Sequence, residues 1–389
     1  MAFDIDAVCE ERSGIAEPMT LKLGARKAPA ELRRKRSSPK GNTTFWKHSF
    51  WRLQYDSQFL RSTVQTTFLL LCSWIGVEFY QFVRWGMSGN SNFVASRPPG
   101  VEGFLPISAL ISLKYWLQTG VINNIHPSGL FIFAAILLMS LLMKKAFCSW
   151  MCPIGTLSES LWMLGNTIFR RNLELPRWLD YPLRSVKYLI LGFFVYAIGS
   201  MDAGSLHVFI ESPYNRMADV KMYQFFANIS YFSLWTILAL VVLSVVVKNF
   251  WCRYLCPYGG LLGLLSFLSP LKVIRQASTC IDCELCTKAC PSTINVHTAK
   301  RVWSDECTAC YNCVEVCPVK NTLNIRAGQN SRPLPSWVFG SLVAGVFIAL
   351  TGLAILTGNW QNSISGDEYL KRFKELDTPA YEHFGARGR

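Results

Sequence analysis

The chain has 389 residues, of which 51 % are hydrophobic and 13 % aromatic, and its mean hydropathy is positive. This composition excludes an ordinary soluble protein, because several apolar runs approach the ~20 residues that span a bilayer. The net charge of +14 would fit a nucleic-acid binder, but anchoring to anionic membrane lipid accounts for the basic residues. We therefore predict an integral membrane protein that does not bind nucleic acid.

The first 62 residues are predicted to form a basic cytoplasmic tail. Residues 1–42 show little apolar periodicity, so we expect them to be largely disordered. The basic run at 33–36 is interpreted as a juxtamembrane anchor that sets topology. No apolar segment follows the first charges, as a cleavable signal peptide would require. Cys9 in this tail and Cys72 further along are given no role.

Five apolar runs are predicted to cross the membrane as helices, at 63–83, 128–143, 186–201, 229–247 and 336–356. The segments 1–62, 144–187 and 248–335 hold 29 of the 39 Lys and Arg residues, which places them on the cytoplasmic side. The predicted fold is an all-α polytopic membrane bundle with a small α+β two-cluster ferredoxin-like cytoplasmic module. A polar C-terminal tail, 357–389, follows the last helix.

Three ionisable residues in or beside these spans are candidates for quinol binding and proton transfer. Glu78 lies inside the first predicted span, where a buried charge costs about 2.5 to 3.5 kcal/mol near mid-bilayer and so suggests function. The alternative is a position near the interface, where its carboxyl group is paired or protonated. His126 precedes the second span and His207 follows the third, on the predicted outer side. A solvated or otherwise satisfied side chain is the simpler alternative for both histidines. Residues 103–118 are predicted to form an interfacial or re-entrant helix that either floors a quinone cleft or packs on the bundle.

A motif that follows two of the spans is duplicated at an offset of 104 residues. It reads Cys148-x3-Cys152-Pro153 in the first copy and Cys252-x3-Cys256-Pro257 in the second. The membrane core, 63–268, is therefore expected to contain two related hairpins whose four cysteines converge. Residues four apart on a helix share a face, so each pair should point at one metal or partner. A third iron-sulfur cluster, a Cu(I) site, dithiol chemistry and simple packing remain open.

A ferredoxin-like segment, 269–330, carries the strongest motif in the chain. It contains two copies of Cys-x2-Cys-x2-Cys-x3-Cys-Pro, the spacing of bacterial two-cluster ferredoxins, in which the fourth cysteine ligates the other cluster. Zinc ligation or a disulfide framework would not require a Cys-Pro at the end of each copy. The predicted ligands are Cys280, Cys283, Cys286 and Cys317 for one [4Fe-4S] cluster, and Cys307, Cys310, Cys313 and Cys290 for the other.

The twelve motif cysteines together resemble the NapH-, MauN- and NosR-type membrane polyferredoxins over about residues 60–327. The resemblance implies electron transfer between the quinone pool and a partner reductase or maturation system in a bacterial cytoplasmic membrane, with quinol oxidation as the implied activity. Copper-reducing oxidase assembly factors of the CcoG kind are similar too, but residues 357–389 are too short for their C-terminal immunoglobulin-like domain. Copper reduction, or a purely structural or assembly role, are the alternatives. The last span and polar tail depart from the NapH pattern, and the chain has no NosR-type flavin domain.

Overall fold

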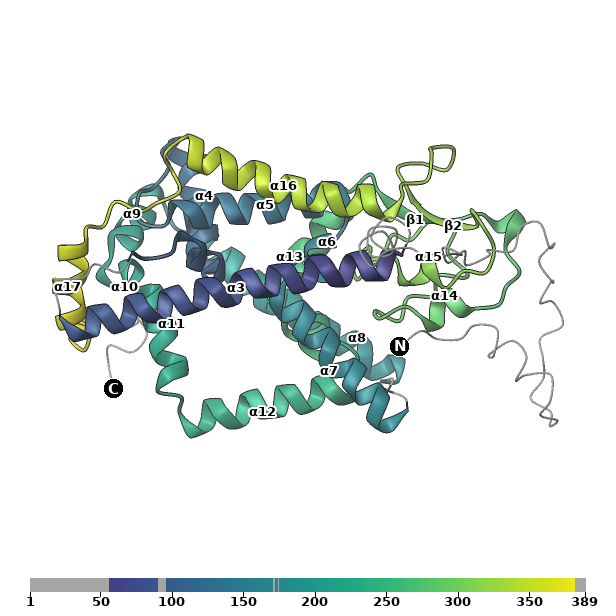
Figure 1. Ribbon diagram of the computed structural model, residues 1–389, viewed down its shortest axis with the longest axis horizontal. Helices are drawn as coiled ribbons and strands as arrows, with labels where there is room; N and C mark the ends of the chain where they lie inside the picture. Colours follow the sequence, from purple (N-terminus) through teal and green to yellow (C-terminus); the bar gives the residue numbers. More distant parts are fainter. Residues whose placement is uncertain (1–55, 90–95, 171, 174, 382–389) are drawn as a thin grey trace, which may run out of the picture.

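The computed structural model describes residues 56–89, 96–170, 172–173 and 175–381. The tail segment 1–42, including Cys9, lies outside these residues. The described chain is an elongated helical bundle with a small sheet-containing module at one end (Figure 1). Its longer helices are α3 (Ser57–Ser88), α4 (Pro106–Thr119), α5 (Pro127–Met143), α7 (Pro153–Phe169), α8 (Arg177–Gly199), α11 (Ala218–Ala227), α12 (Tyr231–Val246), α13 (Pro257–Ser266) and α16 (Ser336–Leu356).

Helix α3 is the longest element and runs along the bundle from the module to its far end (Figure 1). Its start is fixed by Asp56, whose carboxylate accepts hydrogen bonds from the backbone N–H groups of Gln58 and Phe59 at 3.1 and 3.0 Å. Its end is fixed by Gly89, which has a left-handed φ of 64° that suits glycine. Thirty-two helical residues give a length of about 48 Å, longer than a hydrocarbon core.

Helices form at all five predicted spans, but these helices are not all long and apolar enough to cross a membrane. α3, residues 178–199 of α8, and α16 are each long and apolar enough to cross a membrane. α11 and α12 pass together, yet a bend of 84° separates them, and α5 is apolar but has only 17 residues. The chain is therefore a membrane protein, whereas the number of five spans stays a prediction.

The end of the bundle far from the module is built from short helices. η3 (Pro99–Phe104) leads into α4, and α9 (Ala203–Glu211), α10 (Pro213–Arg216), α11 and α17 (Gly366–Lys374) gather beside them (Figure 1). The predicted helix at 103–118 is thus mostly α4, which packs against α5. Lys114 of α4 donates hydrogen bonds to the carbonyls of Ile198 and Gly199 at 2.9 and 2.8 Å, which caps the C-terminus of α8.

The two duplicated motifs lie at corners between helices. In the first copy, α5 is followed by α6 (Ala146–Trp150) and then α7, and in the second, α12 is followed by the π-helical turn η4 (Trp251–Leu255) and then α13. The first helix of each copy packs on the second helix of the other, α5 on α13 and α12 on α7. This crosswise packing brings the two corners together.

The module at the end of the bundle is held by one small sheet. Strand β1 (Lys272–Arg275) pairs antiparallel with β2 (Leu323–Arg326), with Lys272 opposite Arg326 and Val273 opposite Ile325. The short helices α14 (Leu285–Lys288) and α15 (Asn312–Glu315) each carry the third cysteine of a motif. The sheet thus joins the two ends of a loop-rich unit, and the eight motif cysteines lie in the loops between these ends.

The two cysteine loops of the module have the same backbone shape. Asp282 and Glu284 adopt left-handed φ angles of 54° and 61°, and so do Ala309 and Tyr311, 27 residues later, at 50° and 63°. Non-glycine residues in this region are uncommon, so the repetition indicates a loop path that the sequence enforces twice. In each loop, this path curls the Cys-x2-Cys-x2-Cys segment around a centre of its own.

Candidate redox site

The second cysteine of each CxxxCP motif caps a helix. Cys152 and Cys256 have extended backbone angles, and proline occupies the first position of the helix that follows, α7 or α13. Their Sγ atoms accept hydrogen bonds from the backbone N–H groups of Gly155 and Gly259 at 3.4 and 3.3 Å. The prediction that each pair shares one helix face is therefore wrong, because proline starts a new helix after the second cysteine instead of ending a continuous one.

The four CxxxCP cysteines meet although they come from corners 104 residues apart. The electrostatic neighbours of Cys148 include Cys252 and Cys256, and those of Cys152 include Cys256. Tyr258 lies beside these thiols, with Cys148, Cys152 and Cys256 all near its hydroxyl group. Its ring stacks on that of Phe133, with ring centroids 5.8 Å apart. The structure thus assembles a quartet of thiols inside the bundle.

The spacing of these thiols bears on what they could hold. Among the described residues, no three His, Cys, Asp or Glu side chains lie close enough to hold a single metal ion. A [4Fe-4S] cube places its four thiolates on separate irons, farther apart than the ligands of one ion. Four converging soft sulfur donors fit the chemistry of such a cluster.

The second set of module cysteines surrounds one cavity. Its lining includes Cys290, Cys307, Cys310 and Cys313, all at most 9 % exposed. Three of these come from one motif and the fourth from the end of the other motif. The donor set therefore fits a buried [4Fe-4S] cluster.

The first set of module cysteines is more exposed. Cys280, Cys283, Cys286 and Cys317 are each only partly buried. Burial, followed by the charges of Cys283, Cys317 and Cys280, raises the pKa of Cys286 to about 11. Burial, followed by the charges of Cys310 and Cys307, also raises the pKa of Cys290 in the second set to about 12. Such thiols become thiolates at neutral pH only when a cation such as iron binds them.

Both CxxxCP loops touch the loops that carry the second set. In the first loop, Ser149 Oγ donates to the carbonyl of Thr308 at 2.7 Å and Trp150 Nε1 to that of Ala309 at 3.2 Å, between Cys307 and Cys310. In the second loop, Arg253 Nη2 donates to Thr293 Oγ1 at 2.7 Å, three residues after Cys290.

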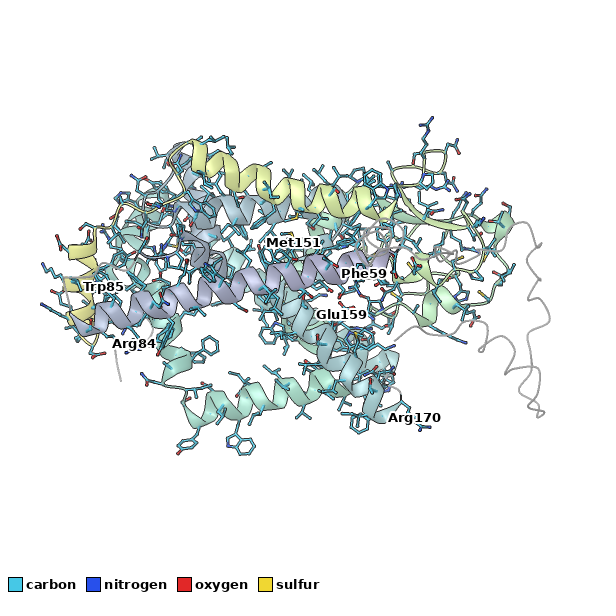
Figure 2. The ribbon with its side chains drawn as sticks, viewed as in Figure 1. Phe59, Arg84, Trp85, Met151, Glu159 and Arg170 are labelled. Atoms are coloured by element: carbon cyan, nitrogen blue, oxygen red, sulfur yellow. The ribbon has the colours of Figure 1, made fainter. Side chains whose placement is uncertain are left out.

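Ser149 and Arg253 are equivalent positions of the repeat, so both copies present the same repeat position to the module, although the residue differs. Sequence reasoning missed these residues, because nothing local distinguishes them from other loop residues. In the view of Figure 2, Met151, which precedes Cys152, lies closer to the Phe59 end of α3 than to the Trp85 end. The thiol quartet therefore lies beside the module and within the bundle.

The three candidate quinol residues occupy different surroundings. Glu78 is half-buried on α3 and accepts a hydrogen bond from Trp74 Nε1 at 2.9 Å. His207 is exposed on α9 beside the ring of Tyr115. His126 is buried, with Nε2 donating to the carbonyl of Asn215 at 2.7 Å. In the described part of the chain, the three share no hydrogen bond or ion pair.

His126 belongs to a buried network of charges at the far end of the bundle. Arg97 forms ion pairs with Glu102 at 2.7 Å and Asp219 at 2.5 Å, and His126 Nδ1 lies 3.4 Å from Glu102 Oε1. Glu102 also accepts a hydrogen bond from the backbone N–H of Gly129 at 2.8 Å. These contacts join η3, α5 and α11, which gives the histidine a structural explanation.

Two family models match the chain. One, described as a 4Fe-4S binding domain, matches residues 125–176 and 229–275, the two CxxxCP hairpins. The other, described as a 4Fe-4S dicluster domain, matches residues 272–318. The chain thus carries iron-sulfur binding domains in both the membrane core and the module.

Relatives with assigned names cover most or part of the chain. YccM of Escherichia coli K12, provisionally named an electron transport protein, is 41 % identical over 345 residues, which is 87 % of this chain and 96 % of that protein. The ferredoxin-type protein NapH of the same organism is 28 % identical over 45 % of this chain and 59 % of its own length. The regulatory protein NosR of Pseudomonas aeruginosa is 27 % identical over 47 % of this chain and 25 % of its own length. No solved structure gives a significant match.

Proposed function

The chain belongs to the NapH/NosR-type family of ferredoxin-type membrane proteins, and from this we propose that it passes electrons between the quinone pool and a redox partner at the module. Bound [4Fe-4S] clusters supply one-electron carriers. The observation that carries the proposal is that both CxxxCP loops hydrogen-bond to the loops of the second set of module cysteines. Such contacts suit transfer between a site in the membrane core and a cluster outside it.

The burial of the module cysteines supports an order for the carriers. In this proposal, Cys307, Cys310, Cys313 and Cys290 hold the cluster next to the membrane core, because they are buried and border both CxxxCP loops. Cys280, Cys283, Cys286 and Cys317 hold the outer cluster, whose partial exposure suits exchange with a partner protein. The CxxxCP quartet forms a further thiolate site on the membrane side.

The membrane placement follows from the same proposal. We place the module and residues 1–62 in the cytoplasm of a bacterium, and five helices in the cytoplasmic membrane. α3, α8 and α16 support this by their length, and the apolar α5 and α12 would be the other two spans.

Glu78 is the proposed proton acceptor for quinol. Oxidation of a quinol to a quinone releases two electrons and two protons, so a carboxylate at a lipid-exposed position is useful there. Trp74, one turn before Glu78 on the same face of α3, is exposed and offers aromatic surface to a quinone ring. Glu78 lies 13 residues beyond Gln65, which donates to the carbonyl of Ser149, so it is about 20 Å along the helix from the CxxxCP level. A redox group at the CxxxCP quartet would shorten the path from Glu78 to the module.

The test is to purify the protein without oxygen, count iron and sulfide, and follow the visible absorbance on adding a soluble quinol. We expect about eight irons for two clusters, or about twelve if the CxxxCP quartet holds a third. Quinol should bleach the clusters of the wild type. Cys148→Ser should slow this bleaching while dithionite still reduces the module, and Cys72→Ser, which lies outside the motifs, should change neither.

Two other results would point to the alternatives. Clusters that quinol cannot reduce, together with Cu(II) reduction that requires Cys148, Cys152, Cys252 and Cys256, would favour a copper-reducing assembly factor. Clusters that no reductant changes would favour a structural role.

A further inference from the structure

Glu306, which directly precedes Cys307, is held between two buried lysines of the membrane core. Lys187 of α8 forms an ion pair with Oε1 of Glu306, and Lys145 Nζ lies 3.6 Å from Oε2. The three side chains are between 0 and 5 % exposed. A buried carboxylate between two ammonium groups therefore joins the first CxxxCP hairpin, α8 and the module.

Lys145 also faces the CxxxCP thiols. It lies three residues before Cys148, and its charge acts on Cys148 and on Cys252 of the other copy. Cys256 is among its own electrostatic neighbours. The repeat places Asn249, not a second lysine, at the equivalent position, where Oδ1 accepts a hydrogen bond from Ser158 Oγ at 3.2 Å. One ammonium therefore lies between the thiol quartet and the residue next to Cys307.

More lysines than carboxylates gather around Glu306. Lys144, Lys145 and Lys187 lie close to the two carboxylates of Asp305 and Glu306. The ammonium of Lys144 donates to the carbonyl of Ser304, at 2.9 Å, and Tyr188 donates to Asp305. A buried ammonium group is stabilised by an anionic group nearby. Metal-bound thiolates at the CxxxCP corner would be that group.

We propose that Lys145 and Glu306 form an electrostatic link that sets the reduction potentials of the CxxxCP site and the adjacent module cluster together. This inference rests on the proposed function, in which both sites carry electrons. Reduction adds negative charge to a metal-thiolate site, so a nearby ammonium raises its potential and a nearby carboxylate lowers it. Lys145 offsets Glu306 at the module cluster and acts directly at the thiol quartet. It is a positioning residue, because it acts through the thiolates.

The experiment is an EPR redox titration of the purified full-length protein and of variants at Lys145 and Glu306, with the adjacent cluster identified by loss of its signal in Cys307→Ser. Lys145→Met should lower the potential of this cluster, and Glu306→Gln should raise it. Each should change the oxidised-to-reduced ratio at a fixed potential about tenfold, or about 59 mV for one electron. Lys145→Arg keeps the charge and should restore the wild-type potential.

The cluster of Cys280, Cys283, Cys286 and Cys317 is an internal control, because its cysteines are the more exposed set and charges near water are screened, so its potential should stay unchanged. Lys371→Met on the exposed side of α17 controls for loss of a lysine. If the ion pair only holds the module against the membrane core, Lys145→Met and Glu306→Gln should shift the reduction potential in the same direction, or should shift the potentials of both module clusters equally. Either result overturns the inference. The titration uses a chemical reductant and not a quinol. Its result therefore does not depend on whether the protein oxidises quinol, which the absorbance experiment tests separately.

Discussion

Cys152 and Cys256 occupy the same position in two copies of one structural corner, each capping a helix that begins with proline. Each sulfur accepts a hydrogen bond from the N–H of a glycine three residues later. The motif is therefore better written CxxxCPxG, in which the glycine belongs to the corner as much as the cysteines do.

The two glycines predict a matched pair of variants. A Cβ on Gly155 would lie 2.2 Å from the carbonyl oxygen of Cys148, whereas one on Gly259 would lie 3.4 Å from that of Cys252. Gly155→Ala should therefore push the first corner apart and cost about 1 to 3 kcal/mol, and Gly259→Ala should be near neutral. The unfolding temperature in detergent and the iron content of the purified variants measure this difference. Equal losses of stability in Gly155→Ala and Gly259→Ala would contradict the corner geometry.

Stability should depend on pH through Glu102. Burial alone would raise the pKa of this carboxyl group, but Arg97, His126 and Ser128 outweigh it and lower the pKa to about 2. The ionised carboxylate therefore stabilises the folded state above its unfolded pKa of about 4.3, and this contribution is lost as the pH falls towards 2.

Glu102→Gln measures that contribution. The gap in unfolding temperature between wild type and variant should be widest above about pH 5 and should shrink as the pH falls. Asp377→Asn, at an exposed position, is the control and should show no such trend. A gap that stays constant down to pH 3 would rule out this role of Glu102.

Arg61 and Glu159 should be strongly coupled. The guanidinium donates two hydrogen bonds to the carboxylate, at 2.6 and 2.8 Å, and joins α3 to α7 with both side chains at most 15 % exposed. Figure 2 shows Glu159 on α7 beside α3. Arg61→Met or Glu159→Gln alone should cost about 3 to 5 kcal/mol because it leaves a buried charge, and the double variant should cost less than the sum. Additive losses in a double-mutant cycle would show that the pair is not coupled.

Lys114→Met should loosen the end of α8. Its ammonium caps the carbonyls of Ile198 and Gly199, and a cation at a partly buried helix C-terminus contributes up to about 2 kcal/mol. We expect a lower unfolding temperature and faster hydrogen exchange at residues 195–199. Lys114→Arg should retain most of the stability, and a similar loss in both variants would argue that packing, rather than charge, matters here.

The sequence predicted the parts of this molecule that depend on local pattern. Apolar composition was enough to find helices at all five predicted spans, since it is read within one segment. The family and the iron-sulfur character were likewise confirmed, because cysteine spacing is local.

Features made by contacts between distant segments could not be predicted in the same way. The packing of α5 on α13, the contact of Arg253 with Thr293 and the burial of Lys145 against Glu306 depend on which helices meet. The CxxxCP corner was misinterpreted for a different reason: both cysteines were expected on one helix, whereas Cys152 lies outside α6 and caps the next helix, which Pro153 begins. A glycine two residues after that proline was the available signal.

Crosswise packing of the two hairpins has a consequence for how such a protein can arise and assemble. Each hairpin contributes two of the four thiols, and each rests on a helix from the other hairpin. A single hairpin could complete the quartet only by pairing with a second copy about a twofold axis, so the fused chain has the form of a homodimer whose gene was duplicated. During synthesis, the site cannot close until the second hairpin leaves the ribosome.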